Sequence, residues 1–167
     1  MVQSITAVGA MILISIGILA MNRGFDTNNL VLQNSRVAIV ATSLATSKIE
    51  EAKGKAFDAG TVDTLILSTT GLTAAAHLGI EGSETYPRYD DFDDFNNTVI
   101  YDTINLGGTN NRVPFTTRCT VCYIDPNYPW TAQAGPTWHK KITVRVTSPV
   151  MNDTITQESI FSYFHFQ

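Results

Sequence analysis

The sequence predicts an α+β fold in which one long N-terminal helix precedes a small antiparallel sheet. Three observations lead to this prediction. Residues 1–22 carry no charged side chain, an amphipathic pattern continues from there to about residue 58, and no proline occurs before Pro87. After residue 60 the pattern changes to short alternating runs separated by turn residues, as adjacent hairpins require. We therefore divide the chain into an apolar arm over 1–25, an amphipathic helix over 26–58 and a β-rich head over 59–167.

The arm is long and apolar enough to cross a bilayer. Its run from Ile5 to Met21 approaches the roughly 20 residues that a transmembrane helix needs. A secretory signal would carry a basic N-terminal region and a small-residue cleavage site, and residues 1–4 and the chain after Met21 show neither. Two interpretations remain open at this point: a plain single-pass anchor, and an arm that also packs against the arms of other subunits.

The amphipathic segment continues the helix. Apolar side chains recur at spacings of three to seven, with alanines between them, and they are Leu30, Val37, Val40, Leu44 and Ile49. Residues 1 to about 57 are thus expected to form one nearly continuous helix, roughly 85 Å long at 1.5 Å per residue. Gly54 and Gly60 mark its exit. The stretch Asn22-Arg23-Gly24 is the weakest helix former, and we expect a kink or an unwound segment there.

The head is expected to hold an antiparallel sheet. Short runs of β-forming residues predict strands at Thr64–Thr69, Thr98–Leu106, Val113–Ile124, Lys141–Thr147 and Thr154–Phe166. Residues 70–97 show little alternation and are expected to form a long surface loop. The turn between the second and third of these strands contains Gly107-Gly108-Thr109-Asn110-Asn111.

Composition and motifs argue against two classes of function. The net charge is −4 and the 11 lysines and arginines are scattered, so no basic surface for nucleic acid is indicated. The sequence contains no G-x-S-x-G, no H-E-x-x-H and no phosphate-binding glycine loop. We therefore expect no catalytic residues and no organic cofactor, and the chain is not expected to be an enzyme.

Several segments together resemble the type IV pilins and pseudopilins. Gly17–Ala20 (GILA) is similar to a stretch common in the pilin arm. Leu44–Lys53 followed by Phe57-Asp58 resembles the end of the long helix in minor pilins and pseudopilins. Tyr89–Phe95 (YDDFDDF) resembles an acidic-aromatic element of minor pilins of the mannose-sensitive haemagglutinin type, and Lys141–Thr147 is similar to the late strand of these heads.

The resemblance implies a structural subunit of an extracellular filament, used for adhesion, motility or surface attachment. Such a subunit waits in the cytoplasmic (inner) membrane and then polymerises with identical copies through its N-terminal helix. The residues expected in the polymer core are Val8, Gly9, Ile12, Ile16, Gly17 and Leu19. The alternatives are a pseudopilin of a type II secretion-like machine and a membrane-tethered binding domain.

Two departures from the pilin pattern matter. Pilins carry a glutamate at the fifth mature position, where this sequence has Ile5, or Val8 if the chains are aligned on GILA, and no acid precedes Asp26. The register of packing would then have to be set by shape rather than by charge pairing. The short basic leader ending in glycine is also not seen, so the chain is expected to be the mature form starting at Met1.

Cys119 and Cys122 form the sequence C-T-V-C. A disulfide is expected in an exported protein. Residues i and i+3 of a regular strand face opposite sides, however, so that a bridge would need a bulge or a turn. Two reduced thiols in the core are the alternative, and zinc is disfavoured because His77, His139 and His165 do not form a ligand motif.

Asp90, Asp91, Asp93 and Asp94 put four carboxylates within five residues. Hard oxygen ligands of this kind suit calcium, which makes calcium the candidate cofactor of this element. The favoured interpretation is a solvated acidic loop anchored by two phenylalanines, Phe92 and Phe95.

Two further patterns in the sequence concern glycosylation and ligand binding. Asn96 and Asn152 begin N-glycosylation sequons, which also occur often by chance. An aromatic set could bind a ligand, but the nearby prolines favour loop packing instead; its members are Tyr86, Tyr89, Tyr123, Tyr128 and Trp130.

Overall fold

A computed structural model describes residues 2–82, 84–107 and 112–163, without the side chains of helix residues 2–7, 26, 27, 29 and 30. Residues 108–111 of the predicted turn and His165 lie outside the described residues. One α-helix, α1, spans Val2–Lys53, and five strands follow it. The α+β fold predicted from the sequence is therefore confirmed. The contacts within the chain divide it into residues 1–37 and residues 38–167, which are described separately below.

The first unit is the N-terminal part of α1. The chain stays helical through Asn22-Arg23-Gly24, so the unwound segment predicted there is not found. Within this unit the 18-residue stretch Val8–Phe25 has a mean hydropathy of 1.7, and none of it is buried within the chain. Length and composition make this helix a candidate membrane anchor or signal sequence.

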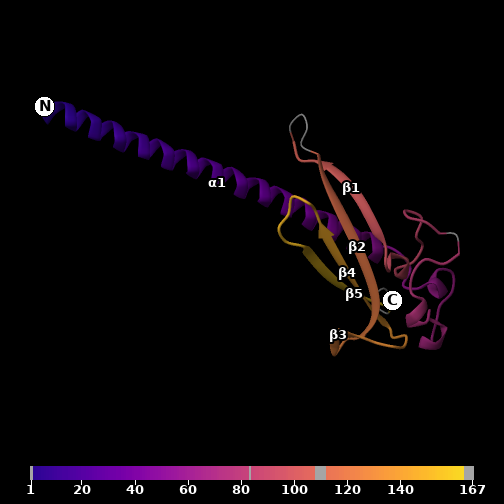
Figure 1. Cartoon of the computed structure of the whole chain (residues 1–167). Helices are drawn as coiled ribbons and strands as arrows, with labels where there is room; N and C mark the ends of the chain where they lie inside the picture. Colours follow the sequence, from indigo (N-terminus) through magenta and orange to yellow (C-terminus); the bar gives the residue numbers. More distant parts are fainter. Residues whose placement is uncertain (1, 83, 108–111, 164–167) are drawn as a thin grey trace. The chain divides into compact units, whose positions relative to one another are not determined.

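The second unit is built on an antiparallel sheet with the strand order β1-β2-β4-β5 (Figure 1). The strands are β1 (Val99–Asn105), β2 (Arg112–Asp125), β4 (His139–Thr147) and β5 (Ile155–Ser162). A short strand β3 (Tyr128–Ala132) pairs with the end of β2, beyond a register shift at Ile124/Asp125. The sequence did not predict β3, because Pro129 and the prolines on either side of it, Pro126 and Pro136, favoured a loop.

Alternation of buried and exposed residues sets one face of the sheet against the core. On β4 the buried residues are Lys140, Ile142, Val144 and Val146. Along the C-terminal part of α1, Ala41, Ala45, Ile49 and Ala52 are buried at spacings of four, four and three, so they share one face of the helix. Alanine lets the helix axis approach the sheet closely. Thr46 of α1 also donates a hydrogen bond to Gln157 of β5, 3.1 Å away.

The segment between α1 and β1 contains four short 3₁₀ turns, η1 (Ala59–Thr61), η2 (Thr69–Gly71), η3 (Ala75–His77) and η4 (Asp93–Phe95). The strand predicted at Thr64–Thr69 is wrong. Leu65 and Leu67 are 60% and 81% exposed, and the Ile66 N–H is bonded to the Tyr163 hydroxyl rather than to a neighbouring strand. Side-chain alternation alone cannot make a strand where the chain offers no partner edge.

Candidate functional site

The residues expected to form the polymer core lie on the exposed helix of the first unit. Val8, Ile12, Ile16 and Leu19 are each between 55% and 59% exposed. Their spacings of four, four and three place them along one side of the helix. A Cβ atom added at Gly9 or at Gly17 would meet no heavy atom within 4 Å, so packing within the chain does not require glycine at either position.

The most elaborate polar site lies in the second unit, around one buried cation. The ammonium of Lys140 donates to Asp58 Oδ2 at 2.7 Å and to the Phe57 carbonyl at 2.8 Å, and it also contacts Asp93 Oδ1. All three charged side chains are fully buried. The ammonium also lies 4.7 Å from the centre of the Phe57 ring. A charge with this many partners is largely compensated.

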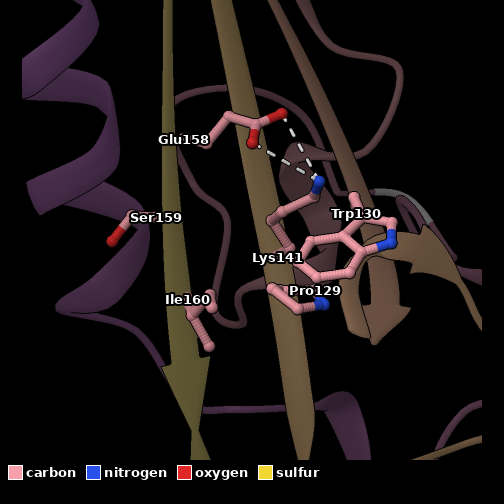
Figure 2. A pocket seen from close by; sticks show the side chains of 6 residues that line it. All are labelled: Pro129, Trp130, Lys141, Glu158, Ser159 and Ile160. Carbon is pink, nitrogen blue, oxygen red and sulfur yellow. Dashed lines mark hydrogen bonds and ion pairs between the residues drawn. The ribbon is translucent and has the colours of Figure 1, made fainter. Parts of the chain in front are cut away.

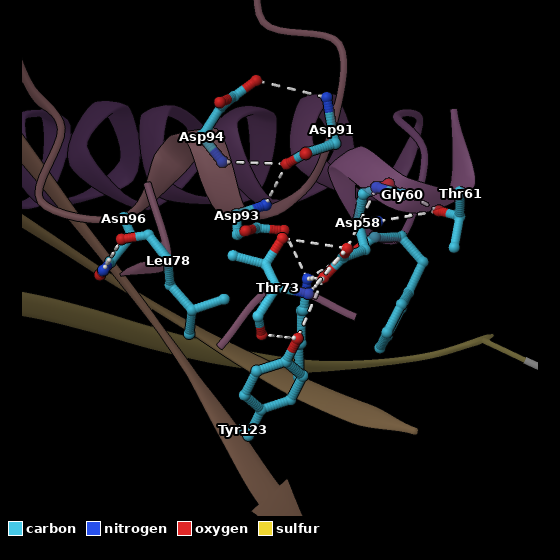
Figure 3. Close-up of polar contacts among 12 residues, drawn as sticks. Asp58, Gly60, Thr61, Thr73, Leu78, Asp91, Asp93, Asp94, Asn96 and Tyr123 are labelled. Atoms are coloured by element: carbon cyan, nitrogen blue, oxygen red, sulfur yellow. Dashed lines mark hydrogen bonds and ion pairs between the residues drawn. The ribbon is translucent and has the colours of Figure 1, made fainter. Parts of the chain in front are cut away.

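Asp58 connects this cation to the loops around it (Figure 3). Its carboxylate caps η1 through Gly60 N–H and also accepts from Thr73 N–H and from the Tyr123 hydroxyl. Burial alone would raise the pKa of Asp58, but the charge of Lys140 and these hydrogen bonds outweigh it and hold the pKa below its usual value. Burial, followed by the charge of Asp58, strongly raises the pKa of Tyr123, so that its hydroxyl stays protonated and donates.

The acidic loop, which we define as residues 81, 82 and 84–94, is not the solvated loop that the sequence favoured. Asp91, Asp93 and Asp94 are fully buried, and of the four aspartates only Asp90 is exposed. Phe92 and Phe95 are fully buried as well, so the expected anchoring by two phenylalanines is found. Hydrogen bonds between the Ala56 backbone and both Asp90 and Phe92 tie the loop to the chain just after α1.

The four aspartates have different partners in the structure, and two glutamates, Glu81 and Glu84, lie close to some of them. Asp93 contacts Lys140, whereas the other three aspartates and the two glutamates form two groups of three carboxylates among the described residues, Glu81–Asp91–Asp94 and Glu84–Asp90–Asp94. Within each group the three candidate ligand atoms all lie within 4.8 Å of one another. No pattern in the sequence pointed to either glutamate, because both precede the acidic element by several residues and neither belongs to a recognisable motif.

Crowding of these carboxylates changes their protonation. Burial, followed by the charges of Asp93 and Asp94, raises the pKa of Asp91 to about 9. The same causes in the same order raise the pKa of Glu81 to about 7. The ion pairs among the described residues place a lysine on Asp58 and Asp93 and none on the carboxylates of the two groups. Among the described residues the loop thus has fewer paired lysines than carboxylates, and the raised pKa values mean that Asp91 and Glu81 take up protons more readily than ordinary carboxylates.

The two cysteines are not brought together. Both thiols are free, Cys119 being buried and Cys122 half-buried. They lie in the regular part of β2, opposite Val144 and Lys141 of β4, and a separation of three residues puts them on opposite faces of the sheet. The structure therefore has two reduced thiols, which was the alternative, and not the expected disulfide. Burial raises the pKa of Cys119 to about 11, which leaves the thiol protonated and unreactive.

The two sequons differ in accessibility. The Asn96 side-chain amide donates to the Leu78 carbonyl at 2.9 Å and its oxygen accepts from Val121 N–H at 2.9 Å. The nitrogen that would carry a glycan is thus already used to hold a loop on the sheet. Asn152 lies exposed in the turn between β4 and β5.

The aromatic set is also divided. Tyr89 and Tyr123 are buried, whereas Tyr128 and Trp130 are 60% and 75% exposed on β3, with ring centres 6.2 Å apart. Figure 2 shows the open groove of about 470 Å³ next to them, lined by Pro129, Trp130, Lys141, Glu158, Ser159 and Ile160. Lys141 and Glu158 form an ion pair of 3.4 Å there.

No protein family, no curated protein and no solved structure matches this chain. The resemblance to type IV pilins therefore stands on the segments quoted above.

Proposed function

We propose that this protein is the structural subunit of an extracellular, type IV pilus-like filament, which waits in the cytoplasmic membrane and polymerises with identical copies through α1. The observation that carries the proposal is the exposed apolar side of the helix at Val8–Phe25, none of which is covered within the chain. An apolar helix of this length needs lipid or other helices around it.

Two features favour a polymerising arm over a plain anchor. The helix does not end at the edge of the apolar stretch but continues to Lys53, well beyond the roughly 20 residues that crossing a bilayer requires. Gly9 and Gly17 leave open space on the helix surface that packing within the chain does not use. Small residues at such positions let helices of neighbouring subunits approach closely once lipid is exchanged for protein.

The same helix also fits a pseudopilin of a secretion machine, which would polymerise in the same way. A membrane-tethered binding domain would need only the anchor, and the groove beside Trp130 would then be its binding surface. These alternatives differ from the filament subunit in where the assembled protein is found and in whether assembly needs the helix surface.

The test compares four forms of the protein at matched expression: wild type, Ile12→Lys, a chain lacking residues 1–25, and Ser43→Lys. Ser43 is an exposed position of α1 outside the apolar stretch and serves as the matched lysine control. A lysine at the centre of a membrane helix costs about 2.5–3.5 kcal/mol on insertion scales. In a filament every subunit repeats the defect, so assembly should suffer more than membrane insertion.

Filaments are counted by electron microscopy after shearing from the cell surface, and the membrane-bound protein is quantified by immunoblotting. We expect filaments from wild type and Ser43→Lys, few from Ile12→Lys and none from the deleted chain. Normal filaments from the deleted chain would refute the proposal. Wild-type protein that stays in the membrane and never appears in a sheared filament would favour the tethered domain.

A further inference from the structure

We infer that the acidic loop is a calcium site, built by Glu81, Asp91 and Asp94 with Glu84 and Asp90 beside them, and that it takes one Ca²⁺ per chain. This inference does not depend on the proposed filament function. The evidence is which carboxylate oxygens of the loop accept hydrogen bonds and which accept none.

One oxygen of each central aspartate is fixed by the backbone. Asp91 Oδ1 accepts from the N–H groups of Asp93 and Asp94, at 2.7 and 3.1 Å. Asp94 Oδ2 accepts from the N–H groups of Asp90 and Asp91, at 3.1 and 3.3 Å. These bonds fold the segment on itself and hold both carboxylates in place before any ion arrives (Figure 3).

The second oxygen of each central aspartate has no hydrogen-bond partner among the described residues. Within that part of the chain, Asp91 Oδ2 and Asp94 Oδ1 are buried and accept no hydrogen bond, and the same holds for Glu84 Oε2. Asp93 Oδ2 is also bare, but the charge of that carboxylate is already compensated by Lys140 at its other oxygen. Leaving a buried polar atom unpaired is costly, and the cost is greater for a charged group. No ion pair among the described residues joins a lysine to Asp91, Asp94 or Glu84. Their bare oxygens therefore call for a partner, either a proton or a bound cation.

The spacing of the oxygens suits a calcium ion. Ca²⁺ binds oxygen at 2.3–2.6 Å, so two of its ligands can be at most about 4.6–5.2 Å apart. The candidate atoms of Glu81, Asp91 and Asp94 all lie within 4.8 Å of one another, as do those of Glu84, Asp90 and Asp94. Asp94 belongs to both groups, and water can complete the shell of an ion held by either group.

Calcium is favoured over the other ions that carboxylates bind. A ligand set made only of oxygen suits a hard cation and offers no nitrogen or sulfur to zinc. Mg²⁺ demands near-ideal octahedral geometry and gives up its waters reluctantly, whereas Ca²⁺ accepts irregular carboxylate clusters. The other arrangement that fits this geometry is a set of shared protons between carboxylates, which would bind no metal.

The experiment titrates CaCl₂ into the full-length protein in detergent after treatment with a chelator. Equilibrium dialysis with radioactive calcium gives affinity and stoichiometry, and near-ultraviolet circular dichroism follows thermal unfolding. We expect one Ca²⁺ per chain and a melting temperature that rises with the logarithm of calcium concentration, as binding to the native state alone requires. Magnesium at the same concentration should have a much smaller effect.

Variants locate the site. Asp94→Asn removes the shared charge but keeps an oxygen for the backbone N–H groups, and it should weaken calcium binding at least tenfold. Glu81→Gln, at a half-buried position of the loop, should also weaken binding and provides the test if Asp94→Asn does not fold. Asp153→Asn, an exposed acid in the turn between β4 and β5, should change nothing. No binding up to 10 mM calcium, or equal binding by wild type and both loop variants, would overturn the inference.

Discussion

The buried lysine of β4 offers the sharpest test of how this fold is held together. In the variant Lys140→Met the side chain keeps most of its length, being one atom shorter, but loses its charge. The contacts to Asp58 Oδ2 (2.7 Å) and to the Phe57 carbonyl (2.8 Å) disappear, together with the ion pair to Asp93. Two carboxylates that are fully buried would then share no cation. Removing one partner of a buried ion pair typically costs about 3–5 kcal/mol.

The neighbouring lysine provides the matched control. Lys141 lies on the opposite face of β4 and pairs at 3.4 Å with Glu158, whose side chain is 52% exposed. The Lys141 side chain is 13% exposed, and the pair opens to solvent at Glu158. Partly exposed pairs contribute about 0–1 kcal/mol, so Lys141→Met should have little effect. The two variants make the same chemical change at adjacent positions and differ in burial and in the number of partners that the ammonium loses.

Thermal unfolding of the full-length protein, followed by near-ultraviolet circular dichroism in detergent with chelator present, measures both variants. For a chain of this size 1 kcal/mol corresponds to roughly 2–4 °C in melting temperature. Lys140→Met should therefore melt roughly 6–20 °C below wild type, and Lys141→Met less than about 4 °C below it. If the two variants melt within about 2 °C of each other, the Lys140 cluster does not stabilise the fold through charge compensation.

Two further predictions concern single side chains in the sheet and its loops. Iodoacetamide should label Cys122 in the folded protein but Cys119 only after unfolding, because Cys119 is 1% exposed and its pKa is raised to about 11. An intact mass two hydrogens below that of the reduced chain would show instead that the two thiols are paired. Asn96→Ala should cost about 1–3 kcal/mol, since its amide bonds two separate segments. Asn152→Ala should cost under about 0.5 kcal/mol, and equal melting temperatures for the two alanine variants would contradict the bridging role of Asn96.

Much of the fold could be predicted because its signals are periodic. The helix pattern ran from the apolar arm through Ala41, Ala45 and Ala52 without a proline, and α1 follows it to Lys53. Short runs of β-forming residues between turns, with clean alternation at Lys141–Thr147, identified the strands that became β1, β2, β4 and β5, with ends shifted by a few residues. The strand expected at Thr64–Thr69 failed and β3 was missed, because strand formation there depends on a neighbouring edge that local sequence does not specify.

The candidate sites were harder to predict because they join residues that are distant in sequence. Asp58 and Lys140 are 82 positions apart, and no local pattern connects them. One signal was present in the sequence. Alternation along β4 places Lys140 on the same face as Ile142, Val144 and Val146, so a charge had to enter the core and needed an acidic partner. The choice of Asp58 and Asp93 as partners follows only from the folded structure.

The YDDFDDF element shows why composition alone could not settle its chemistry. The sequence does not distinguish its four aspartates from one another, but the turn η4 gives neighbouring carboxylates different surroundings. Asp93 reaches the lysine that the sheet supplies, whereas Asp91 and Asp94 are held by backbone N–H groups and keep one bare oxygen each. Lys140 already contacts two carboxylates, so the remaining charge of the loop requires either protons or an external cation. The number of carboxylates buried per available lysine, rather than the acidic run itself, therefore leads to the expectation of calcium.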